Sequence, residues 1–555
     1  MLNDPATEAC LRTQTELESA RSTWEGHWRE VAEYVRPSQA MFQLSQRTPG
    51  DRRNQRIFDD TAPLALPKYA AAVISMGFPA TQRYQSLTTA DPKVAQLHSV
   101  RRWFDEVTDI IFRVRYGPHS NFQSQSGEVV LDVGAFGTGI LFVDDVLGVG
   151  IRYTSLPLSE CYVTEDAWGR INRLHRKFEL TAEQAVAKFD PARLSERVRQ
   201  AAEKTPQAKF WFVHCVYPNE ARDPRQRLHP WMGKRYLSRY IEVGARATVD
   251  EGGYRTFPFA VVRAETAPRE VYGRSPAMKV LPTIKTLNEM KKTVLRAGQR
   301  AVDPPIMLTD DAMLGTFDLR SGALNHGFLD DQRRPAAVPF ESSARVDIGL
   351  ELMDAERQAI NDAFLVTLFR ILVEQPQITA TEAMLRAQEK GQLLTPTIGR
   401  IQADFLGAIT ERELDILSMN GALPDMPPEL AAIGGEYRVE YQSPLTQAQQ
   451  AGRGMAILQG VQGIAPLAQL DPTVMDLIDT QEAAREFLDS VGFPQSAVRD
   501  EAEATQLAEQ RARQAQMQQM LQAAPIAASA AKDLAQAQSL AGSAPGQVAP
   551  AIVPA

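Results

Sequence analysis

The chain has 555 residues, 44% hydrophobic and 23% charged, a balance typical of a folded protein with roughly two to four structural regions rather than of a disordered one. A net charge of −8 argues against a simple basic DNA-binding module, although it leaves room for a local basic stripe. The three cysteines, Cys10, Cys161 and Cys215, are widely separated and form no zinc or disulfide pattern, which fits a reducing compartment.

The sequence predicts neither a signal peptide nor a membrane span. Asp4 and Glu8 stand where a signal peptide needs a cationic start and an apolar run. The best apolar run, residues 134–143, is shorter than the roughly 20 residues that cross a bilayer. The uncharged tail after Asp533 is long enough, but glutamine and proline interrupt it. We therefore expect a soluble protein.

Residues 1–280 predict a mixed α+β body. A helix is expected over 7–36, because Trp24, Trp28, Val31 and Val35 recur at helical spacing before Pro37. Further helices are expected in 57–78 after a turn, over about 95–115 and over about 120–135. Thr181 and Gln184 predict the start of one more helix, which runs through about Phe189. Short β-like runs separated by turn residues lie at 140–145, 149–158, 161–166, 171–180, 209–218, 234–244 and 257–265.

Two helices separated by a non-helical insert follow the body. The first is expected over 283–301 and stops at the prolines of "VDPP", and the second over 346–373. The insert, 302–345, is expected to be loop and short strand. The apolar stripe of the first helix is predicted as Ile284, Leu287, Met290, Val294 and Ala301. That of the second helix is predicted as Ile348, Leu352, Ala355, Ala359 and Phe364.

The two helices carry opposite charge. The first has five basic residues and one acidic residue, a net +4, and the second has five acidic and two basic residues, a net −3. One interpretation is an antiparallel pair whose charges meet across its seam, with the remaining charges in solvent. The other is that the charges serve a function.

A further helix begins inside "QITATEAMLRAQEK", residues 377–390. Thr379 is placed to cap its first turn, and Glu382 completes a capping box. This helix is expected to reach about Gln392, to bend at Pro396 and to resume to about Met419. After Asp500 the chain is rich in alanine and glutamine. That tail is expected to begin as a helix and to end in disorder.

The sequence predicts no catalytic residue, no metal site and no cofactor. It has no nucleoside-triphosphate cradle, no G-x-S-x-G turn and no H-E-x-x-H. "GAFGTG", residues 134–139, is interpreted as a helix-to-strand turn. His214 and Cys215 are expected on opposite faces of a strand, one in the core and one at the surface. Aspartate doublets at 59–60, 144–145, 310–311 and 330–331 are more typical of turns than of a two-metal site.

Six segments in order carry a resemblance to a known family. They are "WEGHWREVAEYVRP" (24–37), "IFDDTAPLAL" (57–66), "YGRSPAMKVLPTIKTLN" (272–288), "VDPPIML" (302–308), "TATEAMLRAQEKGQLLTPTIGRIQ" (379–402) and "YQSPLTQAQQ" (441–450). Together they resemble the head-to-tail connector, or portal protein, of short-tailed bacteriophages (podoviruses), over about residues 20–500.

The resemblance implies a mainly helical α+β portal subunit in a closed ring of roughly twelve copies at one capsid vertex. Double-stranded DNA would pass through the ring, without sequence specificity, during packaging and ejection. The parts would be a wing (1–282), stem helices (283–301 and 346–373), a clip (302–345), a channel loop, kinked helix and return to the wing (374–470), and a crown (471–555). Implied partners are the major capsid protein, the scaffolding protein, the terminase large subunit and the tail adaptor protein. No membrane is involved. The protein would reside in the virion and, during assembly, in the host cytoplasm.

The resemblance also gives roles to the charged stem residues. Glu351, Asp354 and Asp362 would face the channel or the neighbouring subunit. The basic residues of the other helix would pair with them or form basic rings, and these are Lys285, Lys292 and Arg296. A stem helix of 19 residues would be about 28 Å long, a length over which duplex DNA carries roughly 17 phosphates. A uniformly basic lining would grip such a rod, whereas a mostly acidic one would let it slide.

The channel loop and the clip supply the remaining candidate residues. Glu374, Gln375 and Gln377 would contact the moving DNA backbone, and Thr379 with Glu382 would fix where that loop ends. The candidates for docking of the motor and tail in the clip are Asp310, Asp311, Arg320, Arg333 and Arg334.

Two alternative functions remain open on the sequence alone. One is a metal-dependent hydrolase acting on nucleic acid, in which changing an aspartate doublet abolishes nuclease activity. The other is a helical scaffold or adaptor unrelated to capsids, which would appear in electron micrographs as elongated dimers rather than rings.

Overall fold

The computed structural model describes residues 4–39, 50, 54–146, 148, 150–226, 229–308, 318, 320, 322–324, 335, 337–339, 346–367, 397–441, 454–464, 479–490, 493, 497–498 and 503–518. Contacts divide the chain into two units. The first comprises residues 1–87, 107–424 and 439–455, and the second comprises 88–106, 425–438 and 456–555. Among the described helices, none combines the length and the apolar character needed to cross a bilayer.

The first half of the chain contains the helices that the sequence predicts. The long helix α1 covers Pro5–Val35, and the Asp4 side chain caps it by accepting a hydrogen bond from the Ala6 amide. Trp28 of α1 is fully buried and donates to the Phe136 carbonyl at 3.1 Å. The other predicted helices are α2 (Thr61–Gly77), α4 (His98–Arg115) and α5 (Phe122–Phe136), and the sequence did not predict the short helix α3 (Pro92–Ala95).

A three-stranded antiparallel sheet follows α5 directly. Its order is β3 (Gly150–Leu156), β2 (Thr138–Val146) and β9 (Phe259–Arg263). The predicted helix-to-strand turn is confirmed, since α5 ends at Phe136 and β2 begins at Thr138. Gly137 between them has a φ of 79°, and a Cβ there would lie 2.2 Å from the Gly273 carbonyl oxygen, so only glycine fits.

The second sheet has five antiparallel strands. In order they are β4 (Cys161–Glu165), β5 (Ile171–Thr181), β6 (Lys209–Pro218), β7 (Tyr236–Glu242) and β8 (Ala247–Tyr254). The helices α6 (Ala182–Lys188) and α7 (Glu196–Lys204) pack on one face around Phe178, Phe212 and Val198. Thr181 and Gln184 form the predicted capping box. The sequence did not predict α7, which is highly charged, or β8, which contains two glycines.

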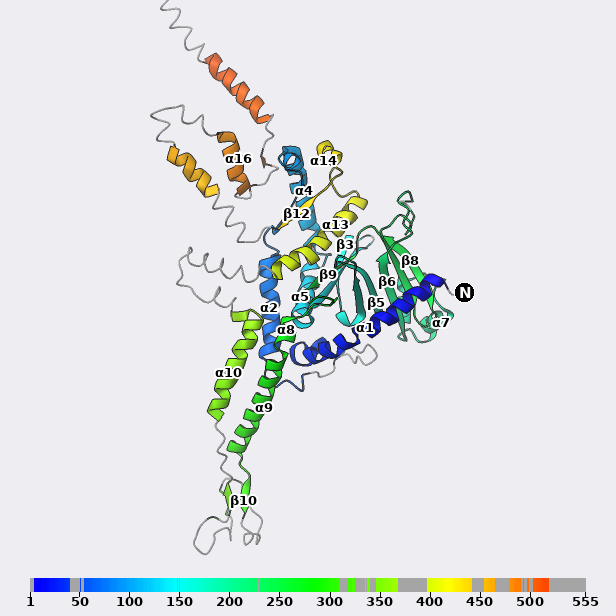
Figure 1. Cartoon of the computed structure of the whole chain (residues 1–555), viewed down its shortest axis with the longest axis vertical. Helices are drawn as coiled ribbons and strands as arrows, with labels where there is room; N and C mark the ends of the chain where they lie inside the picture. Colours follow the sequence, from blue (N-terminus) through cyan, green and yellow to red (C-terminus); the bar gives the residue numbers. More distant parts are fainter. Residues whose placement is uncertain are drawn as a thin grey trace, which may run out of the picture. The chain divides into compact units, whose positions relative to one another are not determined.

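Both faces of the central strand β6 are covered. His214 stacks on Tyr240 at 3.9 Å between ring centroids and hydrogen-bonds to the Ser238 hydroxyl at 2.9 Å. Cys215 points to the opposite face, where α1 lies across the sheet (Figure 1). The expected opposite faces are confirmed, but the expectation of one surface residue is wrong. Both side chains are buried because helices and a second sheet leave neither face of the sheet to solvent.

Two helices project beyond this body. After the short helix α8 (Pro276–Lys279), α9 covers Leu281–Val302 and α10 covers Val346–Ala363. Between them, β10 (Ile306–Leu308) pairs with β11 (Ala337–Pro339) in the predicted insert. The prediction that the second helix continues unbroken to 373 is wrong. It ends at Ala363, and Leu365, with a φ of 60°, is left-handed backbone that an α-helix excludes.

The chain returns to the body through a π-helical turn, Ile401–Leu406, that leads into α13 (Gly407–Met419). The Tyr441 hydroxyl donates to the Gln402 carbonyl of this turn at 2.7 Å. The predicted stop after Met419 is confirmed. The later elements α14 (Pro428–Ala432), β12 (Arg438–Tyr441) and α16 (Thr480–Ser490) follow, and β12 pairs with β1 (Gln85–Thr88). Residues 503–518 are helical as predicted. The capping box at Thr379 and Glu382 lies outside the described residues.

Candidate functional site

The most distinctive feature of the first unit is the pair α9 and α10, here called the helix arm. The two helices run side by side in opposite directions, with the β10–β11 ribbon beyond their far ends (Figure 1). Their contact is close. A Cβ placed on Gly349 of α10 would lie 3.0 Å from the Cγ2 atom of Val294 on α9. At this level the seam of the arm is formed by small apolar groups.

A short segment of the body binds both helices of the arm. The buried Asn288 side chain of α9 donates to the Arg56 carbonyl at 2.7 Å and accepts from the Phe58 amide at 2.7 Å. On α10, the Arg357 guanidinium donates to the Asp59 carboxylate at 2.8 and 3.2 Å. Asp59 also accepts from the Thr61 amide at 3.0 Å, at the start of α2. Residues 56–61 therefore fix where the arm leaves the body.

The pKa of Asp59 reflects this anchoring. Burial alone would raise it, but hydrogen bonds from Thr61 and Arg357, together with the Arg357 charge, outweigh burial and lower the pKa below its ordinary value of 3.8. A carboxylate with a lowered pKa stabilises the folded state above its ordinary pKa. That contribution is lost as the pH falls through the folded-state pKa.

Asp59→Asn should therefore loosen the arm at neutral pH. Loss of a hydrogen-bonded charge pair costs about 1.5–3 kcal/mol, which corresponds to roughly 10- to 100-fold lower protection of the α10 amides in hydrogen–deuterium exchange. The difference from wild type should shrink as the pH falls below about 4. The matched control is Asp60→Asn, because the neighbouring Asp60 makes no side-chain capping bond. Equal protection in the two variants would contradict an anchoring role.

The face that α10 buries differs from the predicted one. Met353, Ile360 and Phe364 are fully buried, and they recur at helical spacing. Of the predicted apolar stripe only Phe364 is buried, and Ile348 and Leu352 are 42% and 51% exposed. The prediction is wrong because α10 carries two apolar faces, and periodicity alone does not show which one packs on the body.

By helical periodicity, the predicted charged site residues of the arm lie away from its seam. Helix positions advance by about 100° per residue, so the three basic side chains of α9 lie about 160–180° around the helix from Val294, which faces α10. These are Lys285, Lys292 and Arg296. On α10 the three acidic side chains lie about 140–160° from Gly349, which faces α9. These are Glu351, Asp354 and Asp362. The arm thus has a basic edge on α9 and an acidic edge on α10.

The ion pairs of Lys285, Lys292 and Asp354 do not cross the seam. Lys285 pairs with Glu30 of α1 at 2.8 Å, and Lys292 pairs with Glu289 of its own helix at 3.0 Å. Asp354 pairs with Arg357 of α10 at 2.7 Å. For these residues, the interpretation in which the charges meet between α9 and α10 is wrong. Arg296, Glu351 and Asp362 are exposed on their edges.

The other predicted site residues are only partly described. Arg320 is exposed and pairs with Asp318 at 2.6 Å. The remaining clip candidates (Asp310, Asp311, Arg333 and Arg334) and the channel-loop candidates (Glu374, Gln375 and Gln377) lie outside the described residues. The sequence analysis missed the anchor formed by Asp59, Asn288 and Arg357. A polar Asn288 beside Leu287 on the apolar face of α9 was the available signal.

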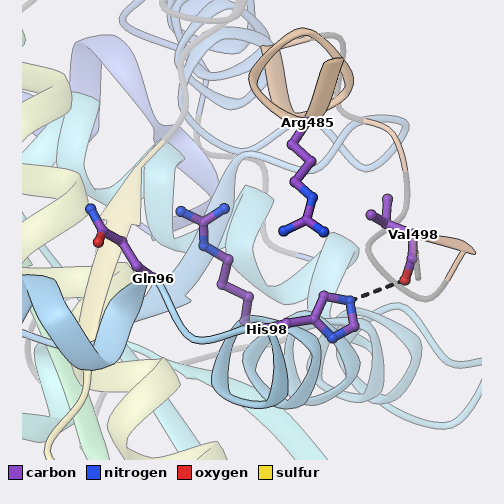
Figure 2. A pocket seen from close by; sticks show the side chains of 5 residues that line it. Gln96, His98, Arg485 and Val498 are labelled. Carbon is purple, nitrogen blue, oxygen red and sulfur yellow. Dashed lines mark hydrogen bonds between the residues drawn. The ribbon is translucent and has the colours of Figure 1, made fainter. Parts of the chain in front are cut away.

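A groove lies along the arm, and a small cavity lies in the second unit. An open groove of about 600 Å³ runs along the arm, with the Met290, Val294 and Gly349 side of the seam in its wall. In the second unit, a small cavity of about 30 Å³ lies between the start of α4 and α16, and Figure 2 shows Gln96, His98, Arg485 and Val498 around it. A His98 ring nitrogen lies 3.0 Å from the Val498 carbonyl oxygen. That cavity has room for only one or two water molecules, so it is not a ligand site.

The sequence comparisons point to one family. A family model described as "Bacteriophage head to tail connecting protein" matches residues 7–498. The portal protein of Salmonella phage epsilon15 is 27% identical over 542 residues, 96% of each chain. A probable portal protein of Bordetella phage BPP-1 is 27% identical over 512 residues, 91% of each chain. A chain in the virion of a native gene transfer agent particle is 12% identical. That match covers 75% of this chain and 91% of the other, with a TM-score of 0.34.

Proposed function

The chain belongs to the bacteriophage head-to-tail connecting protein family and functions as a portal protein, and from this premise we propose that its copies close into a ring through the helix arm. This proposal rests on the opposite charges of the two arm edges. A ring with cyclic symmetry uses a heterologous interface, in which one surface of each copy meets a different surface of the next. The basic edge of α9 and the acidic edge of α10 are complementary surfaces of this kind, since they lie on opposite sides of one arm.

The exposed apolar side chains of α10 support the same interface. Ile348, Leu352, Ala355 and Ala359 lie beside the acidic edge and are exposed in the single chain. An apolar patch framed by charged residues is typical of a surface that another protein covers. A neighbouring copy whose basic edge pairs with Glu351 and Asp362 also covers this patch. Charge then sets the register of the neighbours, and burial of the apolar side chains supplies most of the binding free energy.

We further propose that double-stranded DNA passes through this ring of about twelve copies. The 22 residues of α9 make a helix about 33 Å long, which faces roughly 19 phosphates of a duplex. If the lysines and Arg296 are neutralised by neighbouring carboxylates, they do not grip those phosphates, so the duplex slides. The chain then acts by enclosing DNA, and it catalyses no reaction.

The resemblance to portal proteins gives each part of the chain a proposed role. The α+β body is the wing and contacts the major capsid and scaffolding proteins. The arm is the stem. The insert with β10 and β11 is the clip, which meets the terminase large subunit during packaging and the tail adaptor protein afterwards. Residues 374–470 supply the channel loop and the return to the wing, and residues from 471 supply the crown.

Electron microscopy and native mass spectrometry of the purified chain test this function. We expect closed rings with a central hole, whereas elongated dimers would favour an unrelated scaffold or adaptor. The variant Lys285→Glu/Lys292→Glu should weaken the rings if the basic edge meets a neighbour. It should instead change DNA retention in assembled particles if the edge lines the channel. Glu30→Gln is the control, since it removes the Lys285–Glu30 contact without reversing the edge.

A further inference from the structure

The first turns of α1 are held onto the five-stranded sheet by polar contacts. Asp4, the cap of α1, pairs with Arg239 of β7 at 3.0 Å, and the Thr7 hydroxyl lies 2.7 Å from the Thr248 hydroxyl of β8. Glu8 forms an ion pair with Arg246 in the turn between those strands. Three contacts within five residues fix both the position and the rotation of the start of α1.

This placement brings two cysteines together that are widely separated in the sequence. Cys10 of α1 and Cys215 of β6 belong to one buried cluster with Val213 and Ile241. The two cysteines share this cluster, against which Tyr217 packs. Cys10 is 6% exposed at the edge of the cluster, whereas Cys215 is completely buried. Both are free thiols.

We propose that Cys10 and Cys215 are a redox site, which a peroxide oxidises to a disulfide that fastens α1 to the sheet. The Cys10 thiolate attacks one oxygen of hydrogen peroxide, the O–O bond breaks, and Cys10 becomes a sulfenic acid as water leaves. The Cys215 sulfur then attacks the Cys10 sulfur, the S–O bond breaks, and a second water leaves with the Cys215 proton. Two thiols and one peroxide give one disulfide and two waters, so the step balances.

The electrostatics of the cluster assign the two roles. The hydrogen bond from Cys215 lowers the pKa of the Cys10 thiol to about 7, and the Arg239 and Arg173 charges act in the same direction. Burial raises the pKa of Cys215 well above its ordinary value. Because the thiolate is the reactive form, Cys10 is the attacking residue and Cys215 the resolving one. The third cysteine is different, since burial raises the pKa of Cys161 to about 12.

A protein of the virion passes from a reducing to an oxidising environment, and such a site needs this change. Thiols stay reduced while the chain is made in a bacterial cytoplasm, and disulfides persist once a particle is outside the cell. The disulfide would therefore form late and hold the N-terminal helix in place in the finished particle. This reason rests on the portal function, but the chemistry of the site does not.

The test uses the full chain, purified in reductant and then treated with hydrogen peroxide. After digestion with trypsin under non-reducing conditions, mass spectrometry should find residues 1–12 linked to residues 210–222, with the loss of two hydrogens. The link should vanish on reduction. Residues 153–170, which carry Cys161, should stay unlinked and serve as the internal control. Absence of the 1–12 to 210–222 link, or links between separate chains only, would overturn the proposal.

Variants separate the two roles. In Cys215→Ser, peroxide should leave Cys10 as a sulfenic acid that dimedone traps, whereas Cys10→Ser should give no trapped product at either position. The melting temperature of the wild type should rise on oxidation and fall again on reduction, and neither single variant should show this shift. Cys161→Ser should behave as the wild type. Trapping of dimedone at Cys215, or an oxidation shift in Cys10→Ser, would contradict the assignment. None of these results depends on ring formation.

Discussion

Replacing Glu413 with leucine should lower the free energy of unfolding of the first unit by about 3–5 kcal/mol. Glu413 of α13 and Arg115 at the end of α4 form an ion pair in which both side chains are almost completely buried, at 1% and 0% exposed. Two guanidinium nitrogens donate to the carboxylate at 2.8 and 2.5 Å. Without Glu413, the Arg115 charge stays buried with only neutral partners.

The neutral partners do not replace the carboxylate. Arg115 also donates to the Tyr84 hydroxyl at 2.6 Å and to the Thr410 hydroxyl at 3.0 Å, and Tyr153 donates to Glu413. Burial alone would lower the pKa of Arg115, and the Glu413 charge reverses that effect, so the guanidinium keeps its proton. The leucine variant must therefore bury an unpaired cation or unfold around it.

Hydrogen–deuterium exchange of the peptides from α4 and α13 measures this effect. Protection should fall by about 100-fold or more in Glu413→Leu, since every 1.4 kcal/mol is a factor of ten. The exposed Glu411→Gln on the same helix is the matched control, and it should change stability by less than about 0.5 kcal/mol. The double variant Arg115→Met/Glu413→Leu should recover most of the loss, because neither charge remains. A double variant as unstable as the single one would show that packing, not charge, sets the cost.

Reversing the charge of Arg296 should abolish closed rings at low salt. An exposed ion pair contributes only about 0.2–1 kcal/mol, but a ring of roughly twelve copies repeats each contact at every interface, so the whole assembly loses about 2–12 kcal/mol. Arg296→Glu places a carboxylate on the basic edge, where it repels the acidic edge of the next copy. Native mass spectrometry in about 0.1 M salt should find single chains and fragments of rings.

The arm itself should tolerate this change. In Arg296→Glu the new carboxylate lies one turn from both Lys292 and Arg300, and pairs at this spacing stabilise a helix. Rings should return at about 1 M salt, where the screening length falls to about 3 Å. They should also return in Arg296→Glu/Glu351→Arg, which restores opposite charges across the interface. Glu351 suits this compensation because Val294 lies against Gly349. Measured along the axis of the arm, Arg296 and Glu351 are therefore about one helical turn apart.

A control on another surface makes the result specific. Arg193→Glu causes the same change in net charge on an exposed loop beside α7 and should leave the rings intact. Failure of the compensated double variant, together with intact rings in Arg193→Glu, would mean that Arg296 faces something other than the acidic edge.

Much of the local structure could be predicted from the sequence because short-range rules decide it. Capping residues, prolines and periodic apolar side chains fixed α1, α2, α4, α5 and most strands to within a few residues. The Thr181 capping box and the turn at Gly137 are local in the same sense, since one depends on side chains three residues apart and the other on backbone sterics. The segments that resemble portal proteins likewise gave the family, which the comparisons confirm.

Properties that depend on which faces meet could not be predicted in this way. Charge counts showed that α9 and α10 are opposite in net charge. Only their packing showed which faces form the seam, and that Met353 is buried whereas Leu352 is exposed. The Arg357–Asp59 anchor and the Cys10–Cys215 contact join residues hundreds of positions apart. The sequence by itself determined where most helices and strands form, because backbone sterics, capping and periodicity are local, and its six resembling segments gave the family. Only the tertiary structure decided which side chains become partners, because that depends on long-range packing.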